Sequence, residues 1–187
     1  MKKIVFLIMI ILGLQSISYG EGRLKHGVYE KYYESGALQS RTTYKNGVQH
    51  GSFEVYFKTG ELSTEVKYVN GKRQGVMRSY YKTGTVISET RMKDDRREGL
   101  AEDFYQNGKL RKRIKYSKDK PVGKGVEYYE NGDIKNEWNF VDGRNTYTHK
   151  EYSPGGMILR ERHYKDGRVI KSDFYDKEGQ PIAGEGQ

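Results

Sequence analysis

Hydrophobic, aromatic and glycine residues recur along the chain at a fixed interval of 24 positions. One glycine column is Gly36, Gly60, Gly84, Gly108, Gly132 and Gly156, and a second is Gly27, Gly51, Gly75, Gly99 and Gly123. Aromatic-rich columns are Tyr32, Tyr56, Tyr80, Phe104, Tyr128 and Tyr152, and Tyr44, Tyr68, Met92, Tyr116, Phe140 and Tyr164. An aliphatic column is Leu38, Leu62, Val86, Leu110, Ile134 and Ile158. This period indicates a protein in which one supersecondary unit stacks on copies of itself.

Each unit contains two turn signals, which leave room for two strands of about seven residues. One signal is Ser35-Gly36 and its equivalents, and the other is Asn46-Gly47 and its equivalents, including Asp94-Asp95 and Asp142-Gly143. Asn-Gly pairs favour two-residue hairpin loops because both central positions need positive φ. If both loops have two residues, Tyr33 lies opposite Leu38 and Tyr44 lies opposite Gln49. The pattern therefore predicts an all-β fold, an elongated antiparallel meander of 24-residue hairpins in a single coiled sheet.

Strand alternation assigns each residue to one of two faces. The apolar face is predicted to hold Tyr29, Tyr33, Leu38, Thr42 and Tyr44, and in the next unit Phe53, Phe57, Leu62, Val66 and Tyr68. The opposite face is predicted to hold the Tyr32 column, the charged column Arg41, Glu65, Glu89, Arg113, Glu137 and Glu161, and the mostly basic column Thr43, Lys67, Arg91, Lys115 and Asn139. The second face is thus charged and striped with aromatic rings.

Composition fits a thin sheet better than a compact core. The apolar fraction is 34% and the mean hydropathy is −0.94. A one-layer ribbon leaves its apolar face short of cover, which predicts strong coiling, a partner or self-association. Twelve strands about 4.8 Å apart predict a ribbon roughly 55–60 Å long. Residues 174–179 resemble a shortened seventh unit, as expected of a terminal cap.

The N-terminal 20 residues are predicted to be an export signal. Lys2 and Lys3 precede an apolar run over residues 4–14, which is too short for a membrane span of about 20 residues. Ser18 and Gly20 are small residues that favour cleavage before Glu21, and cleavage after Ser18 is the alternative. We therefore expect a repeat domain over residues 21–187, exported to the periplasm, the extracellular space or the cell surface, without a transmembrane anchor after processing.

The formal net charge of +9 suggests an anionic partner. Export makes nucleic acid an unexpected target, whereas a protein or an anionic envelope component suits an exported basic protein. The chain has no cysteine, which excludes disulfides, thiolate metal sites and a lipidated cysteine anchor.

No residue pattern points to catalysis, to a metal or to a cofactor. His26 and His50 lie one repeat apart, about 10 Å if the units stack, which is too far to share a metal ion. His149 and His163 show no adjacent carboxylate at ligand spacing in this interpretation. Asp94-Asp95 occupies the position of an Asn-Gly turn, so turn geometry explains it.

The sequence resembles bacterial MORN-variant repeat proteins, including those named as the YwqK family of toxin–antitoxin antitoxins. The shared pattern is a glycine, a paired aromatic, an Asn-Gly-like turn and a leucine, seen in residues 51–62 and again in residues 99–110. It covers nearly all of residues 26–180. The resemblance implies β-hairpin repeats and a binding or scaffold role, and it implies no catalytic residues.

We therefore expect a non-enzymatic exported protein that binds a protein or envelope component through its aromatic and charged face. The candidate binding residues are Tyr32, Tyr56, Tyr80, Phe104, Tyr128, Tyr152, Lys67, Arg91 and Lys115. The alternative is an antitoxin-like or immunity protein that neutralises a partner effector with the same surface.

Overall fold

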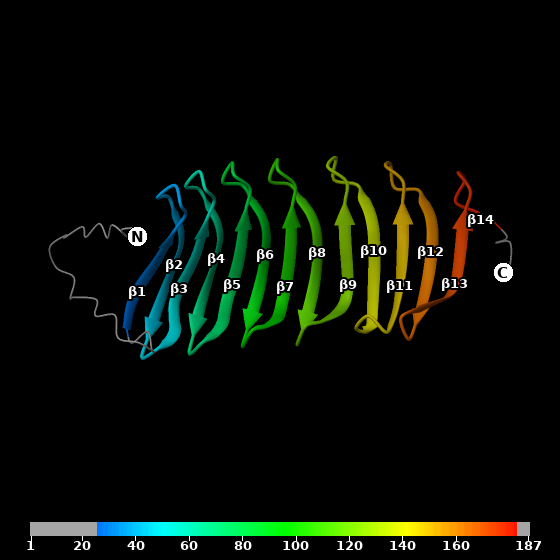
Figure 1. Ribbon diagram of the computed structural model, residues 1–187. Coiled ribbons are helices and arrows are strands. Elements are labelled where there is room, and N and C mark those ends of the chain that lie inside the picture. Colours follow the sequence, from blue (N-terminus) through cyan, green and yellow to red (C-terminus); the bar gives the residue numbers. More distant parts are fainter. Residues whose placement is uncertain (1–25, 183–187) are drawn as a thin grey trace, which may run out of the picture.

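The computed structural model describes residues 26–182, which form one open antiparallel sheet of fourteen strands in chain order (Figure 1). The strands are β1 (His26–Tyr32), β2 (Leu38–Lys45), β3 (Val48–Tyr56), β4 (Leu62–Val69), β5 (Lys72–Tyr80), β6 (Val86–Lys93), β7 (Arg96–Phe104), β8 (Leu110–Ser117), β9 (Lys120–Tyr128), β10 (Ile134–Asp142), β11 (Thr146–Tyr152), β12 (Ile158–Lys165), β13 (Arg168–Tyr175) and β14 (Pro181–Ile182). The predicted meander is confirmed. The strand number exceeds the predicted twelve because the shortened seventh unit adds the hairpin β13–β14. The predicted export signal lies outside the described residues.

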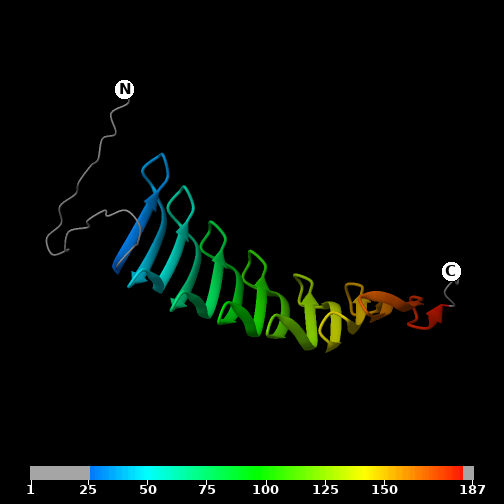
Figure 2. The same ribbon diagram turned by 60° about the horizontal axis from the view of Figure 1, so that its bottom comes forward.

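The ribbon is one layer thick and curves along its length (Figure 2). Loops that follow odd-numbered strands line one long edge of the sheet, and turns that follow even-numbered strands line the other (Figure 1). No helix within residues 26–182 has the length and apolar character needed to cross a membrane.

The turns after β2, β4, β6, β8 and β12 have two residues, as predicted. At the first of them Tyr44 pairs with Gln49 and Lys45 pairs with Val48. Both turn residues have positive φ, 50° at Asn46 and 77° at Gly47. Asp94 and Asp95 repeat this geometry with φ of 49° and 67°, which confirms that they form a turn.

The loops after odd-numbered strands correct the predicted register. Tyr32, not Tyr33, pairs with Leu38. Tyr33 and Ala37 close the hairpin, so the loop between them has three residues, 34–36. The Tyr33 amide donates to the Ala37 carbonyl, and the Gly36 amide donates to the Tyr33 carbonyl. Equivalent loops place Thr59 or Thr83 before the glycine, and a β-branched residue resists the positive φ that a two-residue type I′ loop needs there. A three-residue loop requires positive φ at its glycine alone.

A second departure from a regular ladder follows each of the first four two-residue turns. Thr42 pairs with Phe53 and Tyr44 pairs with Gln49, so three residues of β3 face one residue of β2. Gly51 lies in this bulge with φ of 116°. Because the bulge adds two residues, it preserves the alternation of faces.

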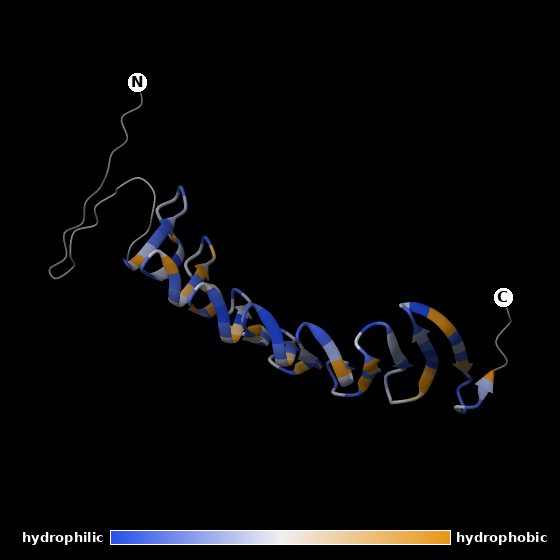
Figure 3. Ribbon diagram, turned by 90° about the horizontal axis from the view of Figure 1, so that it is seen from below, coloured by the Kyte–Doolittle hydropathy of each residue, from blue (hydrophilic) through white to orange (hydrophobic). Residues whose placement is uncertain are grey.

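The lowest exposures belong to the predicted apolar face, hereafter the core face. Thr42, Val66, Met92, Ile114, Tyr116 and Phe140 are 5–9% exposed. No described side chain is below 2% exposure, as expected where neighbouring side chains are the only cover. The Arg97 guanidinium, for example, lies 4.0 Å from the centre of the Tyr116 ring. Hydrophobic residues accordingly form short stretches along the ribbon rather than one block (Figure 3).

Tyrosine hydroxyls link neighbouring hairpins. The Tyr33 hydroxyl donates to the Tyr56 carbonyl at 2.7 Å, one repeat later. Equivalent bonds join Tyr81 to Phe104, Tyr105 to Tyr128, and Tyr129 to Tyr152. Each bond satisfies a strand-end carbonyl and couples adjacent repeats, which are the stabilising contacts of a quasi-one-dimensional protein.

Candidate binding face

The face opposite the core, hereafter the striped face, carries three rows of side chains that run across the strands. The first row is the Tyr32 column, nearest the three-residue loops. The Tyr32, Tyr56, Tyr80 and Tyr152 hydroxyls donate to the carboxylates of Glu30, Glu54, Glu65 and Glu137. The column therefore supports its neighbouring charges as well as presenting aromatic rings.

The middle row is a ladder with one residue from each of thirteen strands. Cross-strand pairing joins Glu30, Arg41, Glu54, Glu65, Arg78, Glu89, Glu102, Arg113, Val126, Glu137, Lys150, Glu161 and Asp173 in that order. Eight members are acidic and four are basic, arranged mainly as acid–base–acid triplets. Ion pairs bind the triplets together, for example Arg78 to Glu89 at 2.6 Å and to Glu65 at 3.3 Å. The basic side chains of this row are thus already paired with acids.

Sequence analysis found the even-strand members of the ladder and missed those of the odd strands. The missed charged residues are Glu30, Glu54, Arg78, Glu102, Lys150 and Asp173, and the missed uncharged member is Val126. The sequence signal for these residues was the spacing between successive ladder members, which alternates between 11 and 13 residues as far as Glu161. The three-residue loop and, as far as Val126, the two-residue bulge together produce that spacing, and neither was predicted.

Hydrogen bonds and burial shift the acidity of this row. The hydrogen bond from Tyr32, together with that from Arg41, lowers the pKa of Glu30. Burial, followed by the hydrogen bond to Glu65, raises the pKa of Tyr80 to about 12. Burial and the hydrogen bond to Glu137 likewise raise the pKa of Tyr152 to about 12. At neutral pH Glu30 is therefore ionised, and Tyr80 and Tyr152 are neutral phenols.

The third row, nearest the two-residue turns, contains the predicted cations Lys67, Arg91 and Lys115. All three are exposed and lie on alternate strands β4, β6 and β8. Within residues 26–182 none of them makes a salt bridge or a side-chain hydrogen bond, unlike the bases of the ladder. Exposed apolar Leu100 pairs with Lys115 in the same row. The predicted residues therefore share one face, with the acid-rich ladder between the aromatic and basic rows.

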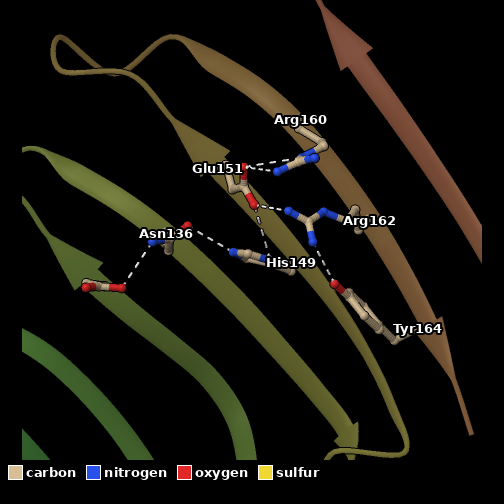
Figure 4. A network of polar contacts seen from close by, with 7 residues as sticks. Asn136, His149, Glu151, Arg160, Arg162 and Tyr164 are labelled. Atoms are coloured by element: carbon tan, nitrogen blue, oxygen red, sulfur yellow. Dashed lines mark hydrogen bonds and ion pairs between the residues drawn. The ribbon is translucent and has the colours of Figure 1, made fainter. Parts of the chain in front are cut away.

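The core face changes character at β10–β12, where a polar network replaces aliphatic packing (Figure 4). Glu151 accepts hydrogen bonds from Arg160 at 2.7 Å and from Arg162. Arg162 also donates to the Tyr164 hydroxyl at 3.0 Å. The Nε of Arg162 is buried without a partner among the described residues.

His149 lies in the same network and corrects the prediction that it has no neighbouring carboxylate. Its Nδ1 is 3.8 Å from Glu151, its Nε2 is 2.9 Å from the Asn136 side chain, and its ring stacks on Trp138. The spacing His-x-Glu was the missed signal, because residues two apart in a strand share a face. Desolvation lowers the pKa of His149, although Glu151 opposes the shift.

His163 corrects the same prediction, since its Nε2 lies 3.6 Å from Glu161 on the striped face. Within the described residues no three His, Asp, Glu or Cys side chains gather at metal-binding distances. A shallow depression of about 390 Å³ lies on the core face near β2 and β3, and it contains no histidine or carboxylate.

Two comparisons with known proteins bear on this arrangement. A search of curated proteins finds no significant match to the chain. The family model described as MORN repeat variant matches residues 25–46, 49–70, 73–94, 97–118, 121–142 and 148–166. These segments follow the observed hairpin units and cover most of the sequence, so the chain belongs to the MORN repeat variant family.

Proposed function

We propose that this protein is a non-enzymatic, exported binding or scaffolding module that holds a protein or an anionic envelope component on its striped face. The observation that carries the proposal is the row of Lys67, Arg91 and Lys115. Three exposed cations on alternate strands stand about 10 Å apart at the strand spacing of a sheet. None has an acidic partner within the described residues, so the row offers positive charge to an external molecule.

The aromatic row adds a second contact surface. The hydroxyls of Tyr56 and Tyr80 are held by carboxylates, which limits the rotation of the rings. Rings ordered before binding lose little conformational entropy when a partner docks. A partner that follows the ribbon would meet the aromatic, acid-rich and basic rows repeatedly, so the repeat itself supplies multivalency.

Face-specific photo-crosslinking in cells tests this proposal. A photoreactive amino acid would replace Lys115 on the striped face and, as a matched control, Lys112 on the core face of the same strand β8. We expect a discrete crosslinked partner from position 115 and little from position 112. Crosslinking that is equal at both positions, or stronger at 112, would contradict the face assignment.

Charge reversal provides a second readout. The variant Lys67→Glu/Arg91→Glu, which leaves position 115 free for the photoreactive residue, should remain folded, because these side chains make no internal ion pair, and should lose the crosslinked partner. Mass spectrometry of the crosslinked product and of the mature N-terminus identifies partner and export together. An intact Met1 in the cytosol with one small effector attached would replace this proposal by the antitoxin-like alternative.

A further inference from the structure

Among the described residues, the C-terminal end of the sheet lacks most of a strand. β14 pairs with β13 only through Phe174–Ile182 and Tyr175–Pro181. Every other even-numbered strand has eight or nine residues. Among residues 26–182, the outer edge of residues 168–173 therefore has no strand partner. Residues 183–187 read Ala-Gly-Glu-Gly-Gln and contain no Lys or Arg.

Exposed apolar side chains gather at this end. Val169, Ile170, Phe174 and Ile182 are 43–63% exposed. Over residues 33–156, by contrast, only Val48, Leu100 and Val141 reach such exposure among the large hydrophobic side chains described, and they lie far apart along the chain. Apolar surface concentrated beside an open strand edge is typical of a surface that another segment covers.

The charged ladder is also incomplete here. Its triplets Glu30–Arg41–Glu54, Glu65–Arg78–Glu89 and Glu137–Lys150–Glu161 each place a base between two acids. Asp173 follows Glu161 and begins a further triplet, but no described base lies across the strand from it. Lys171 of the same strand pairs with Asp173 at 2.8 Å while remaining 62% exposed.

From these three observations we propose that the outer edge of β13 accepts an extended segment of a partner protein in trans. The segment runs antiparallel to β13, places a Lys or Arg opposite Asp173, and presents apolar side chains to the core face beside Ile170 and Phe174. Backbone hydrogen bonds to the edge supply affinity, and the basic residue supplies register. This inference is independent of ligand binding on the striped face.

A second copy of the chain fits this edge less well. The described open edges of a second copy are β1, which carries Glu30, and β13 itself, which carries Asp173. Pairing β1 with β13 would line up three successive carboxylates, Glu161, Asp173 and Glu30, and pairing two β13 edges would line up four. No such run occurs elsewhere in the ladder, and like charges directly opposite one another are destabilising.

A peptide-binding experiment on the full chain tests the proposal. The probe is a fluorescent synthetic peptide of residues 36–46, which contains the strand sequence of β2 with Arg41 in its ladder position. We expect saturable binding by fluorescence anisotropy. The matched peptide with Arg41→Glu should bind about fivefold more weakly, the scale of an exposed ion pair. The chain variant Asp173→Lys should reverse this preference, and its thermal unfolding shows whether it remains folded.

The outcomes separate this inference from the proposed function. Equal affinity for both peptides, or no saturable binding of either, would overturn it. A concentration-dependent dimer in sedimentation equilibrium that Asp173→Lys abolishes would also overturn it, because the occupant would then be a second copy. The variant Lys67→Glu/Arg91→Glu/Lys115→Glu should bind the peptide like the unmodified chain, whether or not it retains a partner on the striped face.

Discussion

The hairpin units of β1–β9 and those of β10–β13 share one sheet but reach it by different local geometry. In the first region a two-residue turn is followed by a glycine bulge, as at Asn46-Gly47 and Gly51. Between β10 and β11 residues 143–145 form a longer loop, so Asp142-Gly143 is not the predicted two-residue turn. Tyr147 stands where the glycine column would continue and pairs regularly with Phe140. The number of residues between paired positions is nevertheless the same in the two regions, as the equivalent pairs Thr42–Phe53 and Trp138–His149 show.

The same repeat length thus accommodates two solutions. In the first region the extra residues form a bulge on β3. In the second region they lie instead in the longer loop before β11 and at Val141, which is one extra residue on β10. What the repeat conserves is the parity that keeps each side chain on its face, because a shift by one residue would exchange the faces. Turn geometry can change between repeats provided that this parity survives.

The two regions also differ on the core face. Val66, Met92 and Ile114 are buried in the first region, whereas His149 and Arg162 occupy the core face of the second within a polar network. A one-layer core tolerates this exchange because no described side chain in it is fully buried. The following tests break or sharpen the contrast, from the largest expected effect to the smallest.

Truncating the aliphatic core should have the largest effect. Ile114→Ala removes a side chain that is 8% exposed and contacts Tyr116 and Phe140. We expect the free energy of unfolding, measured by urea denaturation, to fall by about 2–4 kcal/mol. Leu159→Ala, at a site that is 43% exposed, should change it by less than about 0.5 kcal/mol. Similar losses of stability in the two variants would mean that side chains on the core face contribute no more to stability than those on the striped face.

A side chain at a bulge glycine should be costly only in the first region. Gly99 has φ of 110°, and a Cβ there would lie 2.8 Å from the Cδ of Arg91. Gly99→Ala should therefore destabilise the fold by about 1–3 kcal/mol in thermal or urea unfolding. Tyr147→Phe, at the equivalent position without a bulge, should have little effect. Tolerance of alanine at position 99 would show that the bulge can relax into the second geometry.

The tyrosine hydroxyls that link neighbouring hairpins can be tested by adding one hydroxyl and removing another. Phe57 occupies the position of Tyr33 and Tyr81 but has no hydroxyl. Phe57→Tyr should add a hydrogen bond to the Tyr80 carbonyl and raise the free energy of unfolding by about 0.5–1.5 kcal/mol. Tyr105→Phe should remove the 2.6 Å bond to Tyr128 and lower that free energy by a similar amount. A loss of stability in both variants would show that the added hydroxyl meets no acceptor.

The smallest effect should be a pH response confined to the second region. Desolvation lowers the pKa of His149 in the fold below its ordinary value of 6.5, so folding favours the neutral ring. Its stabilising contribution is present above pH 6.5 and is lost as the pH falls through the lowered value. Glu151 and Glu127 favour the charged ring, and Arg160 and Arg162 oppose it.

Urea denaturation at pH 7.5 and pH 5.5 measures this response. The unmodified chain should lose more stability on acidification than His149→Gln, which keeps a polar group near Asn136. An identical pH dependence in the two proteins would show that folding does not shift the pKa of His149.

The period of 24 residues by itself determined the hairpin repeat, the chain-order meander and the division of residues between two faces. It could do so because strand alternation and positive-φ turn residues act over a few residues and leave a local signature. The Asn46-Gly47 turn and the burial of Thr42 and Val66 follow from that local physics. The grouping of Tyr32, Tyr56 and Lys67 on one face follows from it as well.

Only the tertiary structure decided which residues meet across the strands. The pairing of Tyr32 with Leu38, the complete charged ladder and the network around Glu151 depend on the three-residue loops and the bulges. Each shifts the register by one or two residues, and a small shift redirects every cross-strand partner beyond it. Pairing partners therefore depend on the sum of local irregularities, which becomes visible only when neighbouring strands lie side by side.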